Sequence, residues 1–340
     1  MRILIIRFSS LGDITMATAM PRVLRKKFPD AEIDFATAEE FKDVIEWNPY
    51  LDKKMYLSRG GGIGELFRVL REIKSNKYDV IIDAHRSIRS TIICMLTPSV
   101  KKLYLNKRTL QRLLLIYLKL NVFKRIELQI VEYIKPLKRL GVFYDGKGTE
   151  IFIPADVKER VKKAMLVKIK NFGQKKLVGF VPSAHWPGKR WSVDNFKDLA
   201  GLITKELGAD IIIVGGKKDT FCADIARSYD NVHSFAGEFG IAESAAALSM
   251  CELVVANDTG MMHVAEAVEV DVVSIMGPTS YEFGCYPHRP KSRVVEIDMW
   301  CRPCSKNGQG VCIRSGKRPC LNDVTPEMVL DKVMDSCRRG

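Results

Sequence analysis

The sequence lacks any long hydrophobic run. No segment reaches the roughly 18 consecutive apolar residues that a membrane-spanning helix needs. The opening residues MRILIIR hold an apolar core that is too short for a signal peptide and that is typical of a buried strand. We therefore expect a cytoplasmic protein whose nine cysteines are mostly reduced. The chain also has no low-complexity tract and no short-period repeat, which excludes a repeat array.

Acidic residues are scarce in one stretch. Residues 101–139 hold 11 basic residues and only two acidic ones, and they carry most of the net charge of +14. Residues 1–150 have 28 basic and 17 acidic residues, or +11, whereas residues 151–340 have 26 and 23, or +3. Such an excess favours an anionic partner, and a solvated helix face is the alternative. A uniformly basic surface that binds nucleic acid would not have its positive charge concentrated in one half of the chain, so we expect no nucleic-acid partner.

Short β-branched runs alternate with helical stretches, which predicts parallel sheets covered by helices on both faces. The pattern pauses at Gly146–Gly148, so we predict domains over residues 1–150 and 151–340. The fold class is α/β, with two Rossmann-like, doubly wound halves. Ligands are expected beyond the carboxyl ends of the strands, in a central cleft between the halves. The predicted strands are 3–6, 32–36, 80–83, 101–105, 177–181, 210–214, 253–256 and 272–276. The predicted helices include 12–27, 63–74, 88–96, 110–120, 126–140, 156–170, 193–207, 220–229, 241–250, 260–268 and 326–337.

Three loops at predicted strand ends carry side chains suited to chemistry. Asp13 begins a helix after Ser9, Ser10 and Gly12, where it is either a reactive carboxylate or only a helix cap. This loop is not G-x-G-x-x-G, which disfavours dinucleotide binding.

The second loop places Lys189 and Arg190 between Trp186 and Trp191. The two cations suit a phosphate or diphosphate, and a basic loop anchored by buried rings is the alternative. The third loop joins a buried strand to a helix that starts at Gly260, where backbone N–H groups collect oxyanions. Asp258 and His263 bracket that helix start, and His263 can equally be structural.

Five segments occur in a known order and spacing: RFSSLGDITMATAMP, PSAHWPGKRW, GGKKD, NDTGMMHVAEA and MGPT. Through them the chain resembles the ADP-heptose:lipopolysaccharide heptosyltransferases of glycosyltransferase family 9 over nearly its whole length. The resemblance implies a GT-B fold and an inverting transfer of heptose from ADP-heptose to Kdo-lipid A or the growing inner core. It implies no metal or other cofactor for catalysis. It also implies a peripheral position at the inner face of the inner membrane.

The resemblance also implies roles for individual residues. Asp13 is similar to the catalytic base of the family, and Lys189 is similar to the lysine that stabilises the departing diphosphate. The implied donor-binding residues are Ser183, His185, Arg190, Asp219, Asp258, Thr259, Gly260 and His263. Asp219 matches an acidic residue that faces the ribose, whereas Ala184 and His185 depart from the hydroxyl residues common in the phosphate loop.

Cations of the first half are candidates for a phosphorylated glycolipid acceptor at an anionic membrane surface. The candidates are Arg59, Arg86, Arg89, Lys107 and Arg108. A transfer reaction needs a base on the acceptor side and charge stabilisation on the leaving group, and the two halves divide these tasks.

Four cysteines near the end of the chain, Cys301, Cys304, Cys312 and Cys320, predict a possible structural zinc site. Free thiols or occasional disulfides are the alternative. Cys94, Cys222 and Cys251 lie in apolar helices and are expected in the core.

Two other functions compete with heptosyl transfer. A related GT-B enzyme with another nucleotide sugar or acceptor would share the same motifs. A non-enzymatic anion-binding protein is the remote alternative, and the nearly neutral second half argues against it.

Overall fold

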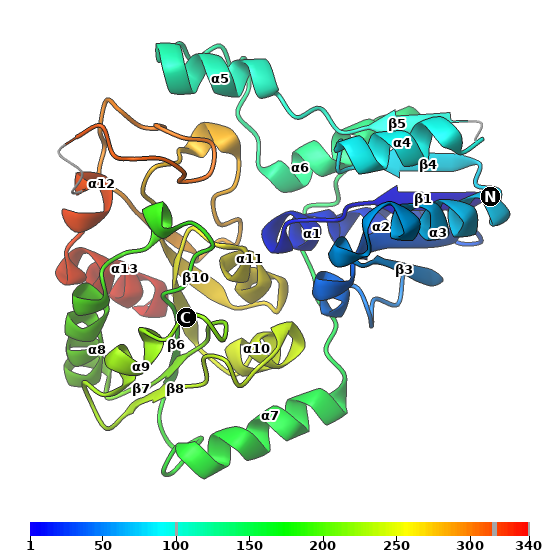
Figure 1. The fold of residues 1–340 in the computed structure, drawn as a ribbon. Coiled ribbons are helices and arrows are strands. Elements are labelled where there is room, and N and C mark those ends of the chain that lie inside the picture. The colour runs from blue at the N-terminus through cyan, green and yellow to red at the C-terminus, as the bar shows by residue number, and fades with distance from the viewer. Residues whose placement is uncertain (99–100, 315–317, 339–340) are drawn as a thin grey trace. The chain divides into compact units, whose positions relative to one another are not determined.

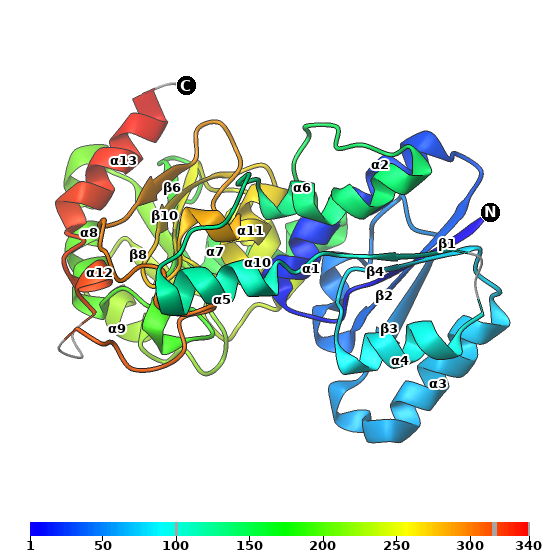
Figure 2. The same ribbon diagram turned by 90° about the horizontal axis from the view of Figure 1, so that it is seen from above.

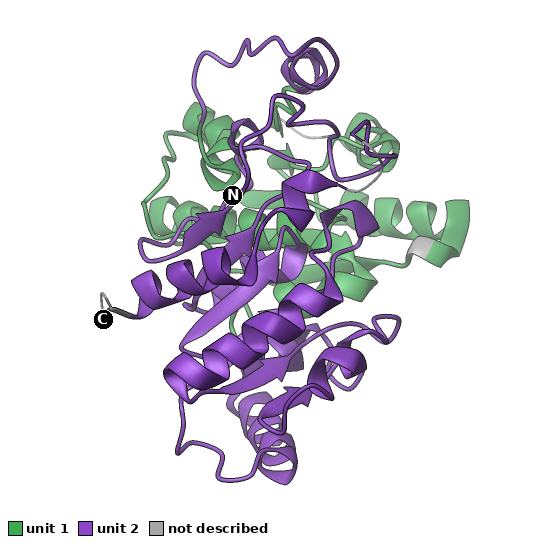
Figure 3. Cartoon of the chain, turned by 90° about the vertical axis from the view of Figure 1, so that its left-hand side faces the viewer, with its two compact units in different colours: residues 1–108, 127–152 green, residues 109–126, 153–340 purple. Residues whose placement is uncertain are grey.

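The computed structural model describes residues 1–98, 101–314 and 318–338. The chain divides into two compact units (Figure 3). Unit 1 comprises residues 1–108 and 127–152, and unit 2 comprises residues 109–126 and 153–340. Each unit is built on one sheet, and in each sheet every pair of neighbouring strands is parallel.

The sheet of unit 1 has the strand order β3-β2-β1-β4-β5 (Figure 1). Its strands are β1 (Arg2–Ile6), β2 (Glu32–Ala38), β3 (Lys53–Leu57), β4 (Val80–Asp83) and β5 (Lys101–Tyr104). Ile3–Ile6 are fully buried because helices cover both faces of the sheet. The helices are α1 (Leu11–Ala17), α2 (Ala19–Lys27), α3 (Gly62–Ser75), α4 (Ile88–Leu96) and α6 (Gln129–Ile134). Figure 2 shows α3 and α4 on one face and α2 and α6 on the other.

The sheet of unit 2 has the order β11-β10-β9-β6-β7-β8. Its strands are β6 (Leu177–Val181), β7 (Asp210–Ile213), β8 (Val232–Ser234), β9 (Leu253–Asn257), β10 (Asp271–Ile275) and β11 (Arg293–Val295). One face packs on α8 (Val193–Leu207), α9 (Cys222–Ala226), α12 (Pro319–Asn322) and α13 (Pro326–Arg338). The other face packs on α7 (Ala155–Lys168), α10 (Ile241–Leu248) and α11 (Gly260–Ala267). Unit 2 also contains α5 (Thr109–Leu118).

The prediction of two parallel α/β sheets is confirmed, and the differences have local causes. The helix predicted over 12–27 is interrupted at Thr18, because Pro21 has no N–H to continue the hydrogen-bond ladder. The helix predicted over 126–140 becomes α6 followed by a 3₁₀ turn, Lys135–Leu140, that contains Pro136. The strands β3, β8 and β11 were not predicted, since they are short edge strands with little of the alternation that marks a strand.

Three further 3₁₀ turns complete the loops of the two units: Glu39–Val44, Pro187–Lys189 and Tyr281–Phe283. A fourth, Arg59–Gly61, includes Arg59, whose side chain lies outside the described part of the chain. Among the described residues, no helix combines the length and the hydropathy that crossing a membrane requires.

Candidate active site

The predicted residues gather where the strand order of each sheet reverses. In unit 1 the reversal lies between β1 and β4, and in unit 2 it lies between β6 and β9. Doubly wound sheets bind ligands at such points, because the loops that leave the two central strands there diverge to opposite faces. Each unit therefore presents one candidate site.

Asp13 is the centre of the site in unit 1. Its Oδ2 lies 2.7 Å from Arg7 Nη2 and accepts hydrogen bonds from the Ser10 hydroxyl at 2.8 Å and the Ser10 N–H at 3.3 Å. Its Oδ1 accepts one hydrogen bond, from the Tyr133 hydroxyl at 2.8 Å. The contact with the Ser10 N–H is part of a capping box, so Asp13 does cap the helix, as the alternative interpretation of the sequence proposed. Capping does not exclude a chemical role, because Oδ1 takes no part in it. Tyr133 was not predicted, because it is 120 residues away in the sequence.

Asp13 is ionised at neutral pH. Burial opposes its charge, but the Arg7 guanidinium and the hydrogen bonds from Ser10 and Tyr133 hold the pKa of the carboxyl well below its usual range. The side chain keeps 32% of its surface exposed, so an incoming hydroxyl can reach it. Because Oδ2 is engaged by Arg7 and Ser10, Oδ1 is the oxygen with a lone pair available for a proton.

The turn after β4 is organised by Asp83, which is fully buried. Its carboxylate accepts hydrogen bonds from the N–H groups of His85 and Arg86 and from the Ser90 hydroxyl. His85 packs edge-on against Phe8 with ring centroids 5.7 Å apart. Burial, together with the charges of Arg7 and Lys107, lowers the pKa of His85 to about 4. His85 is therefore neutral at physiological pH.

His85 makes the stability of unit 1 depend on pH. The unfolded imidazole takes a proton near pH 6.5 and the folded one only near pH 4, so the unfolded state binds more protons between these values. Stability is therefore lost as the pH falls through this window. We expect His85→Asn to reduce the loss of unfolding free energy between pH 7 and pH 5 by about 1–2 kcal/mol. Urea unfolding of both proteins at the two pH values measures this, and identical pH dependence would contradict it.

The cations predicted to bind the acceptor have different surroundings. Arg86 is exposed, with its guanidinium 4.9 Å from the centroid of the Tyr104 ring. Lys107 donates a hydrogen bond to the Arg86 carbonyl at 2.8 Å, and Arg89 is half-buried on α4. Arg108 is buried in an ion pair with Glu132 at 3.3 Å. Of the four candidates whose side chains the structure describes, Arg86 is therefore the most accessible, and Arg108 has a structural partner.

Lys189 and Asp258 form a buried ion pair in unit 2. Lys189 Nζ lies 2.6 Å from Asp258 Oδ2, and the two side chains are 14% and 7% exposed. The Thr279 hydroxyl donates to the same oxygen at 2.6 Å. Burial opposes the charge of Asp258, but Lys189 and Thr279 keep its pKa below the usual value. The pair joins the loops after β6 and β9, so the structure brings together two residues that lie 69 positions apart (258 − 189).

Asn257 fixes the loop that carries Lys189, and sequence reasoning missed it. Its side chain is fully buried, accepts from the Trp191 N–H at 3.1 Å and donates to the Pro182 carbonyl at 2.7 Å. Both ends of the loop are thereby tied to β9. Trp191 is buried and donates from its indole to the Val324 carbonyl at 2.9 Å, so the buried-ring anchor of the loop is also present.

Two glycines allow close packing of the aliphatic part of Lys189 against residues 301–314, which we call the cysteine-rich segment. A Cβ on Gly188 would lie 2.2 Å from the Gly308 carbonyl oxygen. A Cβ on Gly308, whose φ is +83°, would lie 2.6 Å from Lys189 Cγ. The segment around Gly308 therefore helps to hold Lys189 in place.

Gly188→Ala tests this packing. The added methyl group cannot fit beside the Gly308 oxygen, so the loop must shift and move Lys189. If Lys189 stabilises a departing diphosphate, as the family resemblance implies, we expect turnover to fall by about tenfold or more, because small displacements of a charged group weaken its contact with the leaving group. Steady-state kinetics measure the effect. Gly64→Ala is the matched control, since nothing lies within 4 Å of its Cβ position. If Gly188→Ala retained normal turnover, close packing at this point would not matter for activity.

Unit 2 contains a cavity of about 210 Å³, and Thr259, the residue after Asp258, is part of its lining. Ser183 and Thr259, both predicted to bind the donor, line it together with Gly215, Phe239 and Ser244. Thr259 follows Asp258 directly and is the N-cap residue of α11, and Gly260 is the first residue of that helix. The wall is mainly apolar, which suits a flat heterocycle rather than a charged group. Phe239, just before α10, and Ser244, within α10, were not predicted, because no motif marks that stretch of the sequence.

Of the remaining donor-site candidates, Arg190 and Asp219 are brought together. Arg190 donates to the Ala184 carbonyl at 2.8 Å and lies 3.5 Å from Asp219, whose other oxygen accepts from the Gly216 N–H. His185 is exposed and packs edge-on against Trp186. His263 is buried on α11, and its charge when protonated would lower the pKa of Asp258.

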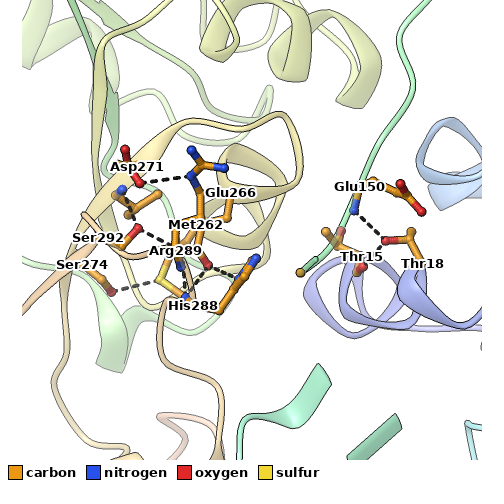
Figure 4. A network of polar contacts seen from close by, with 12 residues as sticks. Thr15, Thr18, Glu150, Met262, Glu266, Asp271, Ser274, His288, Arg289 and Ser292 are labelled. Carbon is orange, nitrogen blue, oxygen red and sulfur yellow. Dashed lines mark hydrogen bonds and ion pairs between the residues drawn. The ribbon is translucent and has the colours of Figure 1, made fainter. Parts of the chain in front are cut away.

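Polar contacts also fix the far end of α11 (Figure 4). Glu266 is 1% exposed and accepts hydrogen bonds from the N–H groups of His288 and Arg289 and from the Ser292 hydroxyl. The same figure shows Thr18 of unit 1, whose hydroxyl accepts from the Glu150 N–H at 3.1 Å. Within unit 2, Glu266 thus ties the last turn of α11 to the chain between β10 and β11.

The four cysteines predicted to bind zinc do not form a metal site in the structure. All are free thiols, and the described residues contain no group of three or more His, Cys, Asp or Glu side chains placed to hold a metal ion. Cys301 and Cys320 are buried, and burial together with the neighbouring cysteines raises the pKa of Cys320 to about 11. Cys94, Cys222 and Cys251 are buried in the core as predicted.

Comparison with known proteins identifies the family. The profile of glycosyltransferase family 9 (heptosyltransferase) matches residues 66–311, well over half of the chain. The chain belongs to glycosyltransferase family 9. It is therefore a glycosyltransferase, which excludes the non-enzymatic anion-binding alternative.

Relatives of this family 9 enzyme match along nearly its whole length. It is 25% identical to lipopolysaccharide heptosyltransferase 2 of Salmonella typhimurium, over 98% of this chain and 97% of the relative. It is 26% identical to lipooligosaccharide heptosyltransferase 2 of Haemophilus influenzae, over 98% of each. The family 9 glycosyltransferase of Veillonella parvula has a TM-score of 0.83 at 23% identity, with 100% of this chain and 98% of that one covered. Escherichia coli ADP-heptose LPS heptosyltransferase II has a TM-score of 0.75 at 21% identity, with 100% and 99% covered. These likenesses confirm the predicted GT-B fold class.

Proposed function

We propose that this enzyme transfers a heptose from ADP-heptose to a hydroxyl of the lipopolysaccharide inner core, with inversion at the anomeric carbon. The observation that carries the proposal is that the loops after β6 and β9, at the strand-order reversal of unit 2, supply both the buried Lys189–Asp258 pair and lining residues of a mainly apolar cavity, Ser183 and Thr259. A diphosphate beside Lys189, with its base in the cavity, matches this distribution of charge and apolar surface.

Unit 2 is proposed to bind the donor. Lys189 and the N–H groups at the start of α11 would neutralise the diphosphate. Asp219, which accepts a hydrogen bond from the Gly216 N–H, would face the ribose, and Ser183 and Thr259 would border the base. The curated relatives named above are heptosyltransferases, and one solved relative is named as an ADP-heptose enzyme. These names support ADP-heptose as the donor.

Unit 1 is proposed to bind the acceptor. Arg86, Arg89 and Lys107 lie on or next to β4, α4 and β5, and their charges suit the phosphates of a lipid A derivative. The acceptor is Kdo-lipid A or heptosyl-Kdo-lipid A. The relatives in Salmonella typhimurium and Haemophilus influenzae are both named heptosyltransferase 2, which favours the heptosylated acceptor. The enzyme would then work at the cytoplasmic face of the inner membrane.

The proposed reaction is a single displacement. The acceptor oxygen attacks the anomeric carbon while the bond from that carbon to the diphosphate oxygen breaks. Oδ1 of Asp13 takes the proton of the attacking hydroxyl, and Lys189 stabilises the negative charge that develops on the leaving phosphate. The low pKa of Asp13 makes it a weak base, so its proton transfer is expected late, when the new bond has made the hydroxyl acidic.

A donor and acceptor screen tests the proposal. ADP-heptose, ADP-glucose and UDP- and GDP-sugars are each incubated with Kdo-lipid A and with heptosyl-Kdo-lipid A, and release of nucleoside diphosphate is followed. We expect turnover with ADP-heptose and one of the two acceptors. Turnover only with another nucleotide sugar would support the alternative GT-B enzyme instead.

A further inference from the structure

Helix α5 exposes apolar side chains on the face opposite its anchor. We call this set the outer face: Leu110, Leu113, Tyr117 and Leu118, which are 67%, 44%, 75% and 61% exposed. At 3.6 residues per turn these four side chains fall within a sector of about 140°. Leu120 and Val122, just after the helix, are exposed as well. Contiguous exposed apolar surface of this kind marks an interaction site rather than ordinary scatter.

The other side of α5 is fixed to unit 2. Leu115 and Ile116 are buried in a cluster with Phe283, against which Phe123 packs. The Arg112 guanidinium lies 5.3 Å from the centroid of the Phe283 ring and donates to the Phe283 carbonyl at 3.3 Å. These contacts hold the helix in one orientation. The outer face therefore stays exposed, because the helix cannot rotate to bury it against unit 2.

Lys119 anchors the end of the helix. Its ammonium donates to the carbonyls of Cys301 and Pro303, each at 2.8 Å. The helix is therefore bound to the cysteine-rich segment, the same segment that packs on Lys189. Lys119 therefore has a structural function, which is to join the end of α5 to the chain at residues 301–303.

The charge of the segment indicates what covers the outer face. Residues 109–126 contain four cations, Arg112, Lys119, Lys124 and Arg125, and no Asp or Glu. Lys124 and Arg125 are exposed. The Glu282 carboxylate contacts this segment by accepting a hydrogen bond from the Asn121 side-chain amide at 3.1 Å. An exposed apolar stripe with a local excess of cations complements an anionic lipid surface.

We propose that the outer face of α5 inserts into the interfacial region of a bilayer that contains anionic phospholipid. At 10 residues α5 is about 15 Å long, half the thickness of the hydrocarbon core, so it would lie on the membrane and not cross it. Tyr117 suits the boundary between headgroups and acyl chains. A second copy packed on this segment about a twofold axis would bring the exposed cations Lys124 and Arg125 of both copies together, which disfavours self-association.

The proposal rests on the proposed function only for the membrane location of the acceptor, and its test does not depend on catalysis. Purified full-length protein is sedimented with vesicles of phosphatidylglycerol and phosphatidylethanolamine, or with vesicles of phosphatidylcholine alone. We expect binding to the anionic vesicles, weakened by salt, and at least about tenfold weaker binding to phosphatidylcholine. The double variant Leu113→Glu/Tyr117→Glu is expected to lose about tenfold or more of the binding to anionic vesicles.

A matched control separates insertion from a simple change of charge. Leu166→Glu/Val167→Glu makes the same charge change at two exposed apolar residues of α7, which are 53% and 87% exposed. We expect it to bind vesicles like the wild type, and thermal unfolding shows whether both variants are folded. No binding by the wild type, or equal losses in the two variants, would overturn the proposal. So would a wild-type dimer that dissociates in the α5 variant without any vesicle binding. If the proposed function fails instead, no heptose is transferred although the vesicles still bind.

Discussion

Asp13→Asn is expected to lower turnover by about 10²–10⁴-fold, because an amide cannot take the proton of the attacking hydroxyl. Donor affinity is expected to change by less than about threefold, since the proposed donor site lies in unit 2. The amide oxygen can still accept from Ser10, and Arg7 keeps its hydrogen bond to the Ala84 carbonyl at 2.6 Å. Steady-state kinetics and donor titration by calorimetry measure the two effects.

Tyr133→Phe is the control for this result. It removes the hydrogen bond to Oδ1 but leaves the carboxylate and its Arg7 partner in place. We expect a loss of turnover of about tenfold at most, from the loss of one hydrogen bond to a charged group. Near-normal turnover of Asp13→Asn would contradict the assignment of Asp13 as the base and leave it as a helix cap.

Lys189→Ala is expected to lower turnover by about 10²-fold or more, because the leaving diphosphate loses its cation. It also leaves the Asp258 carboxylate buried without its partner, which costs about 3–5 kcal/mol of unfolding free energy. The two losses have different causes and can be separated. Kinetics measure the first and urea unfolding measures the second.

Adding Asp258→Asn to Lys189→Ala makes the separation. The double variant buries no unpaired charge, so we expect most of the stability to return. Turnover should stay low, because the diphosphate still lacks its cation. If turnover returned together with stability, Lys189 would have a structural function only.

The fold could be predicted, and candidate residues could be assigned to strand ends, because both depend on local signals. Alternating strands and helices indicated two parallel sheets, and the loops after residues 6, 181 and 257 follow central strands. Lys189 and Asp258 lie in two of those loops, and Asp13 lies in the first turn of α1, directly after the loop that follows residue 6. The sequence pattern alone did not show that Lys189 pairs with Asp258, since nothing in the spacing of the two loops encodes that contact.

Contacts between distant parts of the chain were not predictable. Tyr133 on Asp13, and the Gly308 carbonyl against Gly188, depend on how separate elements pack. The cysteine spacing led to a prediction that the structure does not support. The spacing is typical of zinc sites, but the described residues contain no group of side chains placed to hold a metal ion. Helix α5 was predicted from its periodicity, but only the structure shows that two of its sides are apolar and that one of them is exposed.

The most direct test of the proposed heptosyl transfer is the product itself. Kdo-lipid A and heptosyl-Kdo-lipid A are each incubated with the enzyme and ADP-heptose, and the acceptor is characterised by mass spectrometry and NMR. Our account predicts a gain of one heptosyl unit on one of the two acceptors, with the anomeric configuration opposite to that of the donor. An unchanged mass of both acceptors, or a product that retains the donor configuration, would contradict it.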